Sequence, residues 1–265
     1  MKGRVLIVAG SDSGGGAGIQ ADIKAVTALG GFAATAITAL TAQNTLGVHG
    51  VLPIPLDFIR QQMRVVLDDI GADAIKTGML HDSATIEAVC AELPDGVPLV
   101  ADPVMIAKGG HSLLQDAAVS TLRRLLLPRA TVLTPNLPEA EVLTGMKIRS
   151  AADMPAVGRA LLALGPRAVL LKGGHLEGDR LVDLLVTAEG IESFEGERIA
   201  TRHTHGTGCT MASAVAAGLA QRLSLHDAVA RARAYVLAAI KAAPGYGAGH
   251  GPLDHGVTFD EGKLA

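Results

Sequence analysis

The sequence has 265 residues, of which 49% are hydrophobic, 18% are charged and 2% are aromatic, and its formal net charge is −3. These values exclude a disordered chain, which needs low hydrophobicity and high charge, and they argue against a nucleic-acid-binding protein, which usually has a basic face. The apolar run at residues 5–9 is too short for a signal-peptide core or a membrane span. We therefore expect a cytoplasmic enzyme with no membrane segment, folded as one domain over residues 1–265.

Short aliphatic runs alternate along the chain with longer segments of helical period, which is the pattern of βα units around a mainly parallel sheet. We predict strands near residues 4–9, 34–40, 73–77, 98–102, 131–134 and 168–172, and then an antiparallel or edge pair near 181–187 and 191–199. We predict helices near residues 16–29, 56–69, 83–92, 114–126, 153–164, 208–221 and 225–242. The fold class is therefore α/β, and the chain should close with a helical pair.

Polar residues follow four of the predicted strands at the point where each strand ends. They are Gly10-Ser11-Asp12, Asp102-Pro103, Thr134-Pro135-Asn136 and Lys172-Gly173-Gly174. In open α/β sheets, ligands bind outside the carboxyl ends of the strands. The coincidence predicts one binding site along that edge of the sheet.

Two nucleotide-binding motifs can be tested directly. No G-x-x-x-x-G-K-[ST] sequence occurs, which excludes an ordinary P-loop. Residues 16–21 match the dinucleotide fingerprint G-x-G-x-x-A, but residues 39–44 lack the acid that would bind a ribose. A tight strand-to-helix turn that needs glycine is the alternative reading of residues 16–21.

The segment Gly206-Thr207-Gly208-Cys209-Thr210 precedes a predicted helix. Glycines let backbone N–H groups converge at a helix N-terminus, which stabilises an anion such as a phosphoryl group in transfer. The same field should lower the pKa of the Cys209 thiol and favour a thiolate that accepts a proton. Two other readings stay open: a plain helix cap with a small buried cysteine, and a metal site made by His203, His205 and Cys209, for which no fourth ligand is evident.

Three further residues carry charges or oxygens suited to a nucleotide. Asn136 and Glu139 form an N-x-x-E pattern after a strand, in which Asn136 would cap a helix and Glu139 would hold Mg²⁺ directly or through water. Asp102 is a second candidate for that ion, and Lys172 is placed to neutralise nucleotide phosphates. An ordinary capping pair and a solvent-facing lysine are the alternative interpretations.

Taken together, these segments resemble the hydroxymethylpyrimidine/phosphomethylpyrimidine kinase family of thiamine biosynthesis, within the ribokinase-like superfamily. The resemblance covers nearly the whole chain in seven ordered blocks, at residues 9–22, 37–45, 76–80, 102–105, 134–141, 171–175 and 249–252. His203 and Thr77 are the departures from the family pattern, and neither removes a group assigned to the chemistry.

The resemblance implies a three-layer α/β/α sandwich with a central, mainly parallel sheet. It implies that the protein uses ATP, with Mg²⁺ as cofactor, to phosphorylate the hydroxyl of 4-amino-5-hydroxymethyl-2-methylpyrimidine and then the resulting monophosphate. Carried over residue by residue, it assigns Gln43, Asp22, Gly10, Met79 and Val104 to the pyrimidine pocket.

By the same resemblance, Asn136 and Glu139 belong to the Mg²⁺–phosphate site and Lys172 to ATP. Residues 206–209, including Gly206, Thr207 and Gly208, form the anion hole, and Cys209 occupies the position of the base. A homodimer is also implied. The alternatives are a pyridoxal kinase or dual-specificity enzyme of the same superfamily, a non-catalytic ligand-binding module and a dinucleotide oxidoreductase.

Overall fold

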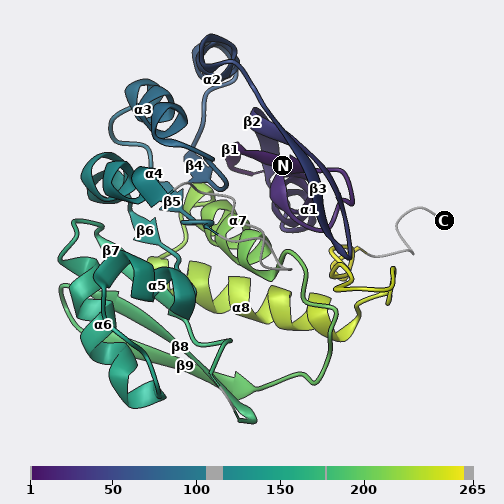
Figure 1. Cartoon of the computed structure of the whole chain (residues 1–265), viewed down its shortest axis with the longest axis vertical. Coiled ribbons are helices and arrows are strands. Elements are labelled where there is room, and N and C mark those ends of the chain that lie inside the picture. Colours follow the sequence, from purple (N-terminus) through teal and green to yellow (C-terminus); the bar gives the residue numbers. More distant parts are fainter. Residues whose placement is uncertain (1, 106–115, 177, 260–265) are drawn as a thin grey trace.

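Nine strands form one sheet in the computed structural model, which describes residues 2–105, 116–176 and 178–259 (Figure 1). Their order is β3-β2-β1-β4-β5-β6-β7-β8-β9. The pairs from β2 to β7 are parallel, and β3, β8 and β9 add antiparallel strands at the two edges. The strands are β1 (Arg4–Asp12), β2 (Phe32–Asn44), β3 (Gly47–Pro53), β4 (Ala74–Thr77), β5 (Leu99–Ala101), β6 (Val132–Leu133), β7 (Ala168–Lys172), β8 (Arg180–Thr187) and β9 (Ile191–Glu197).

Helices cover both faces of this sheet. One apolar core joins the sheet to α2, α3, α4, α5 and α6, and the other joins it to α1, α7 and α8. The helices are α1 (Gly18–Ala28), α2 (Leu56–Asp69), α3 (Ser83–Glu92), α4 (Asp116–Thr121), α5 (Leu137–Thr144), α6 (Met154–Leu162), α7 (Thr207–Ala220) and α8 (Leu225–Lys241). The predicted three-layer α/β/α sandwich is thereby confirmed.

The predicted elements agree with the structure except at a few places. The predicted helix ranges lack α5, whose start was indicated only by the Asn136 cap, and residues 114–115 of the predicted helix 114–126 lie outside the described residues. The closing helical pair and the antiparallel edge pair are both observed. Strand β3 was not predicted, because its sequence GVHGVLP has two glycines, a proline and no run of aliphatic residues. After α4, the helix continues through a π-helical turn, Leu122–Leu126, and a 3₁₀ turn, Leu127–Arg129.

The parallel strands are buried on both sides, as their uninterrupted aliphatic sequences predict. Val5–Ala9 of β1, for example, are all at most 1% exposed. None of the helices in the described ranges combines the length and the hydrophobicity that a membrane crossing requires.

The carboxyl ends of the parallel strands meet along one edge of the sheet. There Thr134 N donates to Ala101 O at 3.0 Å, and Lys172 N donates to Pro135 O at 3.0 Å. This register places the polar residues that follow β5, β6 and β7 side by side. The end of β4 links them to β1, because Asp102 N donates to Thr77 O at 3.0 Å and Gly78 N donates to Val8 O at 3.0 Å. The predicted binding edge is therefore a single continuous surface.

Candidate active site

The N-terminus of α7 lies against the loop that follows β1. Gly206 is the N-cap of α7 and has a φ of 81°, a left-handed conformation that favours glycine. A Cβ atom at this position would collide with the carbonyl oxygen of Gly16. Close approach of two backbone segments therefore requires Gly206, and it leaves the first N–H groups of α7 at the strand-end edge, where an anion is stabilised.

An ion pair flanks the start of α7. Lys172 Nζ, at the end of β7, lies 3.2 Å from Asp102 Oδ1, just beyond β5. The Thr134 hydroxyl also donates to Asp102 Oδ1, at 3.0 Å. A Cβ atom on Gly208 would lie 3.3 Å from Lys172 Nζ, so the lysine and the helix N-terminus face the same space.

Lys172 keeps its positive charge in this setting. Burial alone would lower its pKa, but the carboxylates of Asp102 and Glu139 outweigh that effect and raise the pKa of Lys172 above its ordinary value. A partly exposed, permanently charged lysine beside a helix N-terminus can stabilise phosphate oxygens.

Asn136 and Glu139 form a capping box at the start of α5. The Asn136 side chain accepts from Glu139 N at 2.9 Å, and Glu139 Oε2 accepts from Asn136 N at 2.8 Å. The ordinary capping interpretation is thus confirmed. Burial and, to a smaller extent, the neighbouring Asp102 raise the pKa of Glu139 to about 7, although Lys172 acts in the opposite direction.

The carboxylates of Asp102 and Glu139 supply oxygen donors of the kind that Mg²⁺ prefers. The described residues contain no group of three or more His, Cys, Asp or Glu side chains able to hold a metal by themselves. Two carboxylates fit an ion that keeps its waters and shares its coordination with nucleotide phosphates. A divalent cation would also relieve the repulsion that raises the Glu139 pKa.

Asp22 does not line the open crevice. Its carboxylate accepts hydrogen bonds from Lys76 Nζ at 2.9 and 2.8 Å and from the Ser213 hydroxyl at 2.6 Å, and its side chain is fully buried. The resemblance assigned Asp22 to the pyrimidine pocket, whereas in the described structure its carboxylate binds a lysine.

The expected thiolate of Cys209 is wrong for this structure. Burial raises the pKa of its thiol to about 12, although the ammonium of Lys76 acts in the opposite direction. The expectation considered only the field of the α7 N-terminus. It omitted the desolvation of the thiol and the repulsion of a thiolate by the carboxylates of Asp22 and Asp102, both of which raise the pKa.

A small apolar surface lies beside β1 and β4. Met79 and Ala39 are buried together, and Val104 packs against them. A Cβ atom on Gly10 would lie 3.0 Å from the Met79 sulfur, so the absence of a side chain at Gly10 keeps this surface flat. Flat apolar walls of this kind suit a planar ring. Three residues assigned to the pyrimidine pocket thus come together.

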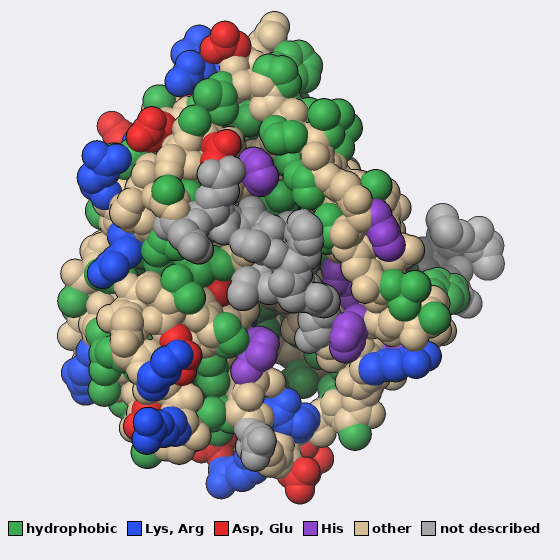
Figure 2. All heavy atoms as spheres, viewed as in Figure 1, with side chains coloured by type: hydrophobic (Ala, Val, Ile, Leu, Met, Phe, Trp, Pro, Cys, Tyr) green, Lys and Arg blue, Asp and Glu red, His purple; other side chains and the backbone are tan. Residues whose placement is uncertain are grey.

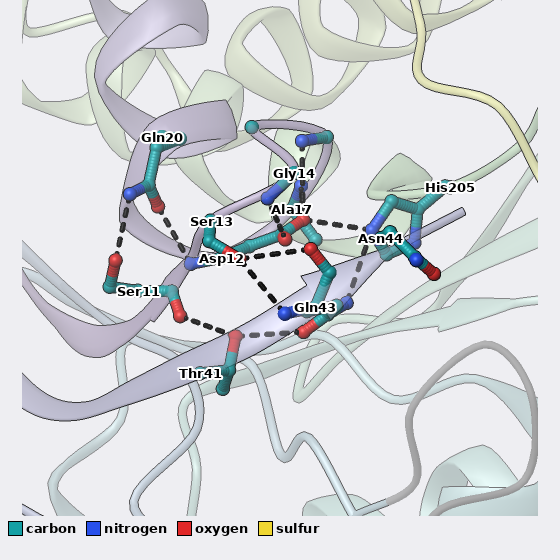
Figure 3. Close-up of polar contacts among 12 residues, drawn as sticks. Ser11, Asp12, Ser13, Gly14, Ala17, Gln20, Thr41, Gln43, Asn44 and His205 are labelled. Atoms are coloured by element: carbon teal, nitrogen blue, oxygen red, sulfur yellow. Dashed lines mark hydrogen bonds and ion pairs between the residues drawn. The ribbon is translucent and has the colours of Figure 1, made fainter. Parts of the chain in front are cut away.

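Gln43 stands near the end of β2, opposite Val48 of β3, which packs against this surface, and Gln43 makes four polar contacts (Figure 3). Its backbone N–H donates to Ser13 Oγ at 2.8 Å, and the Ser13 hydroxyl donates to its carbonyl oxygen at 2.9 Å. Its side-chain amide lies 3.1 Å from Thr41 Oγ1 and 3.3 Å from His205 Nε2. The position of this side chain is therefore well determined.

His205 and Asp12 connect the β1 loop to α7. His205 Nε2 lies 2.9 Å from Asp12 Oδ2, and both side chains are buried. The sequence did not predict the pairing of Asp12 with His205, because the two residues are 193 positions apart. An acid at the end of the first strand and a histidine just before the helix N-terminus were the available signals.

The tip of the β2–β3 hairpin meets the C-terminal part of the chain. His250 N donates to Thr45 O at 2.9 Å, and His205 N donates to Gly251 O at 3.1 Å. A small pocket at this junction is lined by Gln43, Asn44, Thr45, Gly47, Val48, His205 and His250. On the face seen in Figure 2, histidine side chains gather near the centre and right of the view, whereas Lys and Arg side chains lie mainly towards its margins.

The family model and the curated proteins that match this chain agree with one another in the function they name. The family model described as phosphomethylpyrimidine kinase matches residues 12–254. Hydroxymethylpyrimidine/phosphomethylpyrimidine kinase of Streptomyces coelicolor is 50% identical over 97% of this chain and 96% of its own length. The thiamine biosynthesis bifunctional protein of Geobacter sulfurreducens is also 50% identical, over 98% of this chain, which spans 54% of that longer protein.

Solved structures give the same fold. An ADP complex of Bacillus subtilis pyridoxal kinase has a TM-score of 0.90 at 38% identity, over 97% of this chain and 98% of its own. Pyridoxal kinase of Staphylococcus aureus in complex with AMP-PCP and pyridoxal has a TM-score of 0.89 at 35% identity, over 97% and 94%. Phosphomethylpyrimidine kinase of Clostridium difficile has a TM-score of 0.79 at 40% identity, over 89% and 98%.

Proposed function

Because this chain belongs to the phosphomethylpyrimidine kinase family, we propose that it uses ATP to phosphorylate 4-amino-5-hydroxymethyl-2-methylpyrimidine and then the resulting monophosphate. One observation carries this proposal. The anion site at the start of α7, the Lys172–Asp102 pair and the apolar surface beside Gln43 occupy the same strand-end edge. A phosphate donor and a flat alcohol can meet there.

In-line transfer of a phosphoryl group depends mainly on positioning and electrostatic stabilisation. The backbone N–H groups at residues 206–209 and the ammonium of Lys172 would stabilise charge on the transferring group. Asp102 and Glu139 would hold Mg²⁺, through water where necessary. When bound, that ion neutralises phosphate oxygens.

The pyrimidine would lie on Met79, Val104 and the backbone of Gly10. The Gln43 amide offers both a donor and an acceptor, which suits a ring nitrogen beside an exocyclic amine. Asp22 would act on this pocket through Lys76 rather than by direct contact. Its role is then to fix the cation next to Cys209.

The family resemblance assigns Cys209, in the first turn of α7, to the position of the base. Because its thiol is protonated at neutral pH in this structure, a role as base requires that substrate or ATP binding first releases that proton. In the second phosphorylation the attacking phosphate oxygen is already ionised, so no base is needed.

A phosphorylation assay with each pyrimidine supplied separately tests this proposal. The wild-type protein should consume ATP in both reactions, and Lys172→Met should lose at least about a hundredfold in kcat for both. Absence of turnover with either pyrimidine, despite measurable ligand binding, would leave a non-catalytic binding module as the better interpretation.

A second candidate substrate is pyridoxal or a related hydroxymethylpyridine. The observation that favours it is the TM-score of 0.90 to a pyridoxal kinase, combined with 38% identity. Parallel steady-state assays on pyridoxine and hydroxymethylpyrimidine would decide between them. The pyrimidine kinase should show the larger kcat/KM for the pyrimidine.

We also propose a homodimer located in the cytoplasm, with small molecules and no nucleic acid or membrane as partners. Leu40 on β2 and Leu52 on β3 are register partners, 40% and 63% exposed, and Phe58 on α2 is 54% exposed. These side chains supply apolar area for pairing. Sedimentation velocity on the wild type and on Leu52→Lys measures the association directly.

A further inference from the structure

Two groups face one ring nitrogen of His205 (Figure 3). Asp12 Oδ2 lies 2.9 Å from His205 Nε2, and Gln43 Nε2 lies 3.3 Å from the same nitrogen. A nitrogen of neutral imidazole either donates or accepts, and an amide nitrogen only donates. His205 Nε2 therefore cannot donate to the carboxylate and accept from the amide at the same time.

The charge of Asp12 determines whether His205 Nε2 donates to the carboxylate or accepts from the amide. Its carboxylate already accepts from the backbone N–H groups of Gly14, Gly16 and Ala17, at 2.8, 3.1 and 2.8 Å. Burial would raise its pKa, but the hydrogen bonds from His205 and the backbone outweigh burial and keep the pKa below its ordinary value. An ionised carboxylate can only accept, so His205 Nε2 carries a hydrogen and donates it to Asp12.

This tautomer leaves the amide nitrogen of Gln43 facing another donor. The Thr41 hydroxyl has a similar conflict, because its one hydrogen already goes to Ser11 O at 2.8 Å, while Gln43 Oε1 lies 3.1 Å away. Both conflicts disappear when the amide is turned by half a rotation. Gln43 Oε1 then shares the single Nε2 hydrogen of His205 with Asp12 Oδ2 in a three-centre hydrogen bond, and the amide nitrogen of Gln43 donates to Thr41 Oγ1.

We infer that His205 is a positioning residue that sets the direction in which the Gln43 amide meets the pyrimidine. With one amide hydrogen on Thr41 and one lone pair on His205, Gln43 keeps one N–H and one lone pair for the ring nitrogen and the exocyclic amine of the substrate. This step rests on the proposed function. His205 immediately precedes Gly206, so the same residue ties the pyrimidine site to the start of α7.

Matched variants separate this role from simple packing. His205→Leu removes the donor, whereas the amide nitrogen of His205→Gln can donate from nearly the same place as Nε2. We expect His205→Leu to raise KM for hydroxymethylpyrimidine about tenfold, with KM for ATP and kcat within about twofold, because one buried hydrogen-bonded contact is lost. His205→Gln should recover most of that loss. His226→Gln, on α8, whose histidine also contacts a carboxylate, is the control and should match the wild type.

Equal KM values for the pyrimidine in His205→Leu, His205→Gln and the wild type would overturn the inference, as would a parallel rise in KM for ATP and fall in kcat in both variants. A second measurement needs no activity. In protein labelled with ¹⁵N-histidine, the long-range ¹H–¹⁵N spectrum should show His205 as the Nε2–H tautomer, assigned by its absence from His205→Gln. An Nδ1–H tautomer would also overturn the inference. If the wild type phosphorylates no pyrimidine, the proposed function fails while the tautomer result still stands.

Discussion

Lys76 Nζ lies 2.9 and 2.8 Å from the two carboxylate oxygens of Asp22, and both side chains are completely buried next to the first turns of α7. The pair crosses from the end of β4 to α1 and is joined by the Ser213 hydroxyl of α7. It is the only described ion pair in which both side chains are fully shielded from solvent. Three elements, β4, α1 and α7, are therefore held together by one buried charge pair.

Lys76→Met should destabilise the protein by about 3–5 kcal/mol, because it leaves the Asp22 carboxylate buried without its cation. The double variant Lys76→Met/Asp22→Leu should recover much of that loss, because it removes the second buried charge as well. Urea unfolding of both variants measures the difference. A single variant as stable as the wild type would show that Asp22 is neutral in the folded protein.

Cys209→Ala should reduce kcat for the first phosphorylation by about a hundredfold and for the second by no more than about threefold, since only the first step needs a proton acceptor. The two pyrimidines must be supplied separately. Cys209→Ser keeps the size of the side chain and is the control for packing. Equal losses in both steps would remove Cys209 as a base and leave the anion site at the start of α7 unaffected.

Glu139 should make stability depend on pH. The folded protein binds this proton up to about pH 7, whereas the unfolded chain releases it near the ordinary value of 4.5. Between these values the folded state holds more protons than the unfolded state, so the free energy of unfolding falls as pH rises. Between about pH 5 and about pH 8, the decrease in the free energy of unfolding should be smaller by about 2 kcal/mol in Glu139→Gln than in the wild type. Urea unfolding at the two pH values measures this difference. An unchanged pH dependence in the variant would contradict the assignment.

Thr77 offers a gain in stability. Its hydroxyl is completely buried on β4 and has no hydrogen-bond partner among the described residues. Thr77→Val removes an unsatisfied polar group at nearly constant volume and should stabilise the protein by about 1 kcal/mol.

Thr38→Val is the matched control, because the buried Thr38 hydroxyl donates to Met79 O at 2.7 Å. Its loss should destabilise by about 1 kcal/mol or more. Thermal unfolding of the two variants should therefore give melting temperatures displaced in opposite directions from that of the wild type.

Much of the architecture follows from local sequence. Buried parallel strands are uninterrupted aliphatic runs, and β7 begins and ends at the predicted residues, 168 and 172. The grouping of Lys172 with Asp102 also follows, because parallel strands end at one edge of the sheet. The capping box at Asn136 and Glu139 is a local pattern and was predictable for the same reason.

The partners of buried polar groups were not predictable from sequence. Nothing in the local pattern of Asp22 indicates that Lys76, 54 positions later, takes both of its oxygens. The pKa of Cys209 depends on how tightly the first turn of α7 is enclosed, and a helix-terminus rule contains no such information. Pairings across the chain and the extent of desolvation both require coordinates.

The pairing of Asp12 with His205 has a consequence for biosynthesis. The loop after β1, which contains Asp12, is made at the start of translation, but His205, which holds this loop, follows 193 positions later. A nascent chain that has emerged only through β9 can form most of the sheet and still lack the contact that orders the Asp12 loop. Long-range closure of this kind is also slow to form during folding. The ribosome must therefore release nearly the entire polypeptide before any catalytic activity appears.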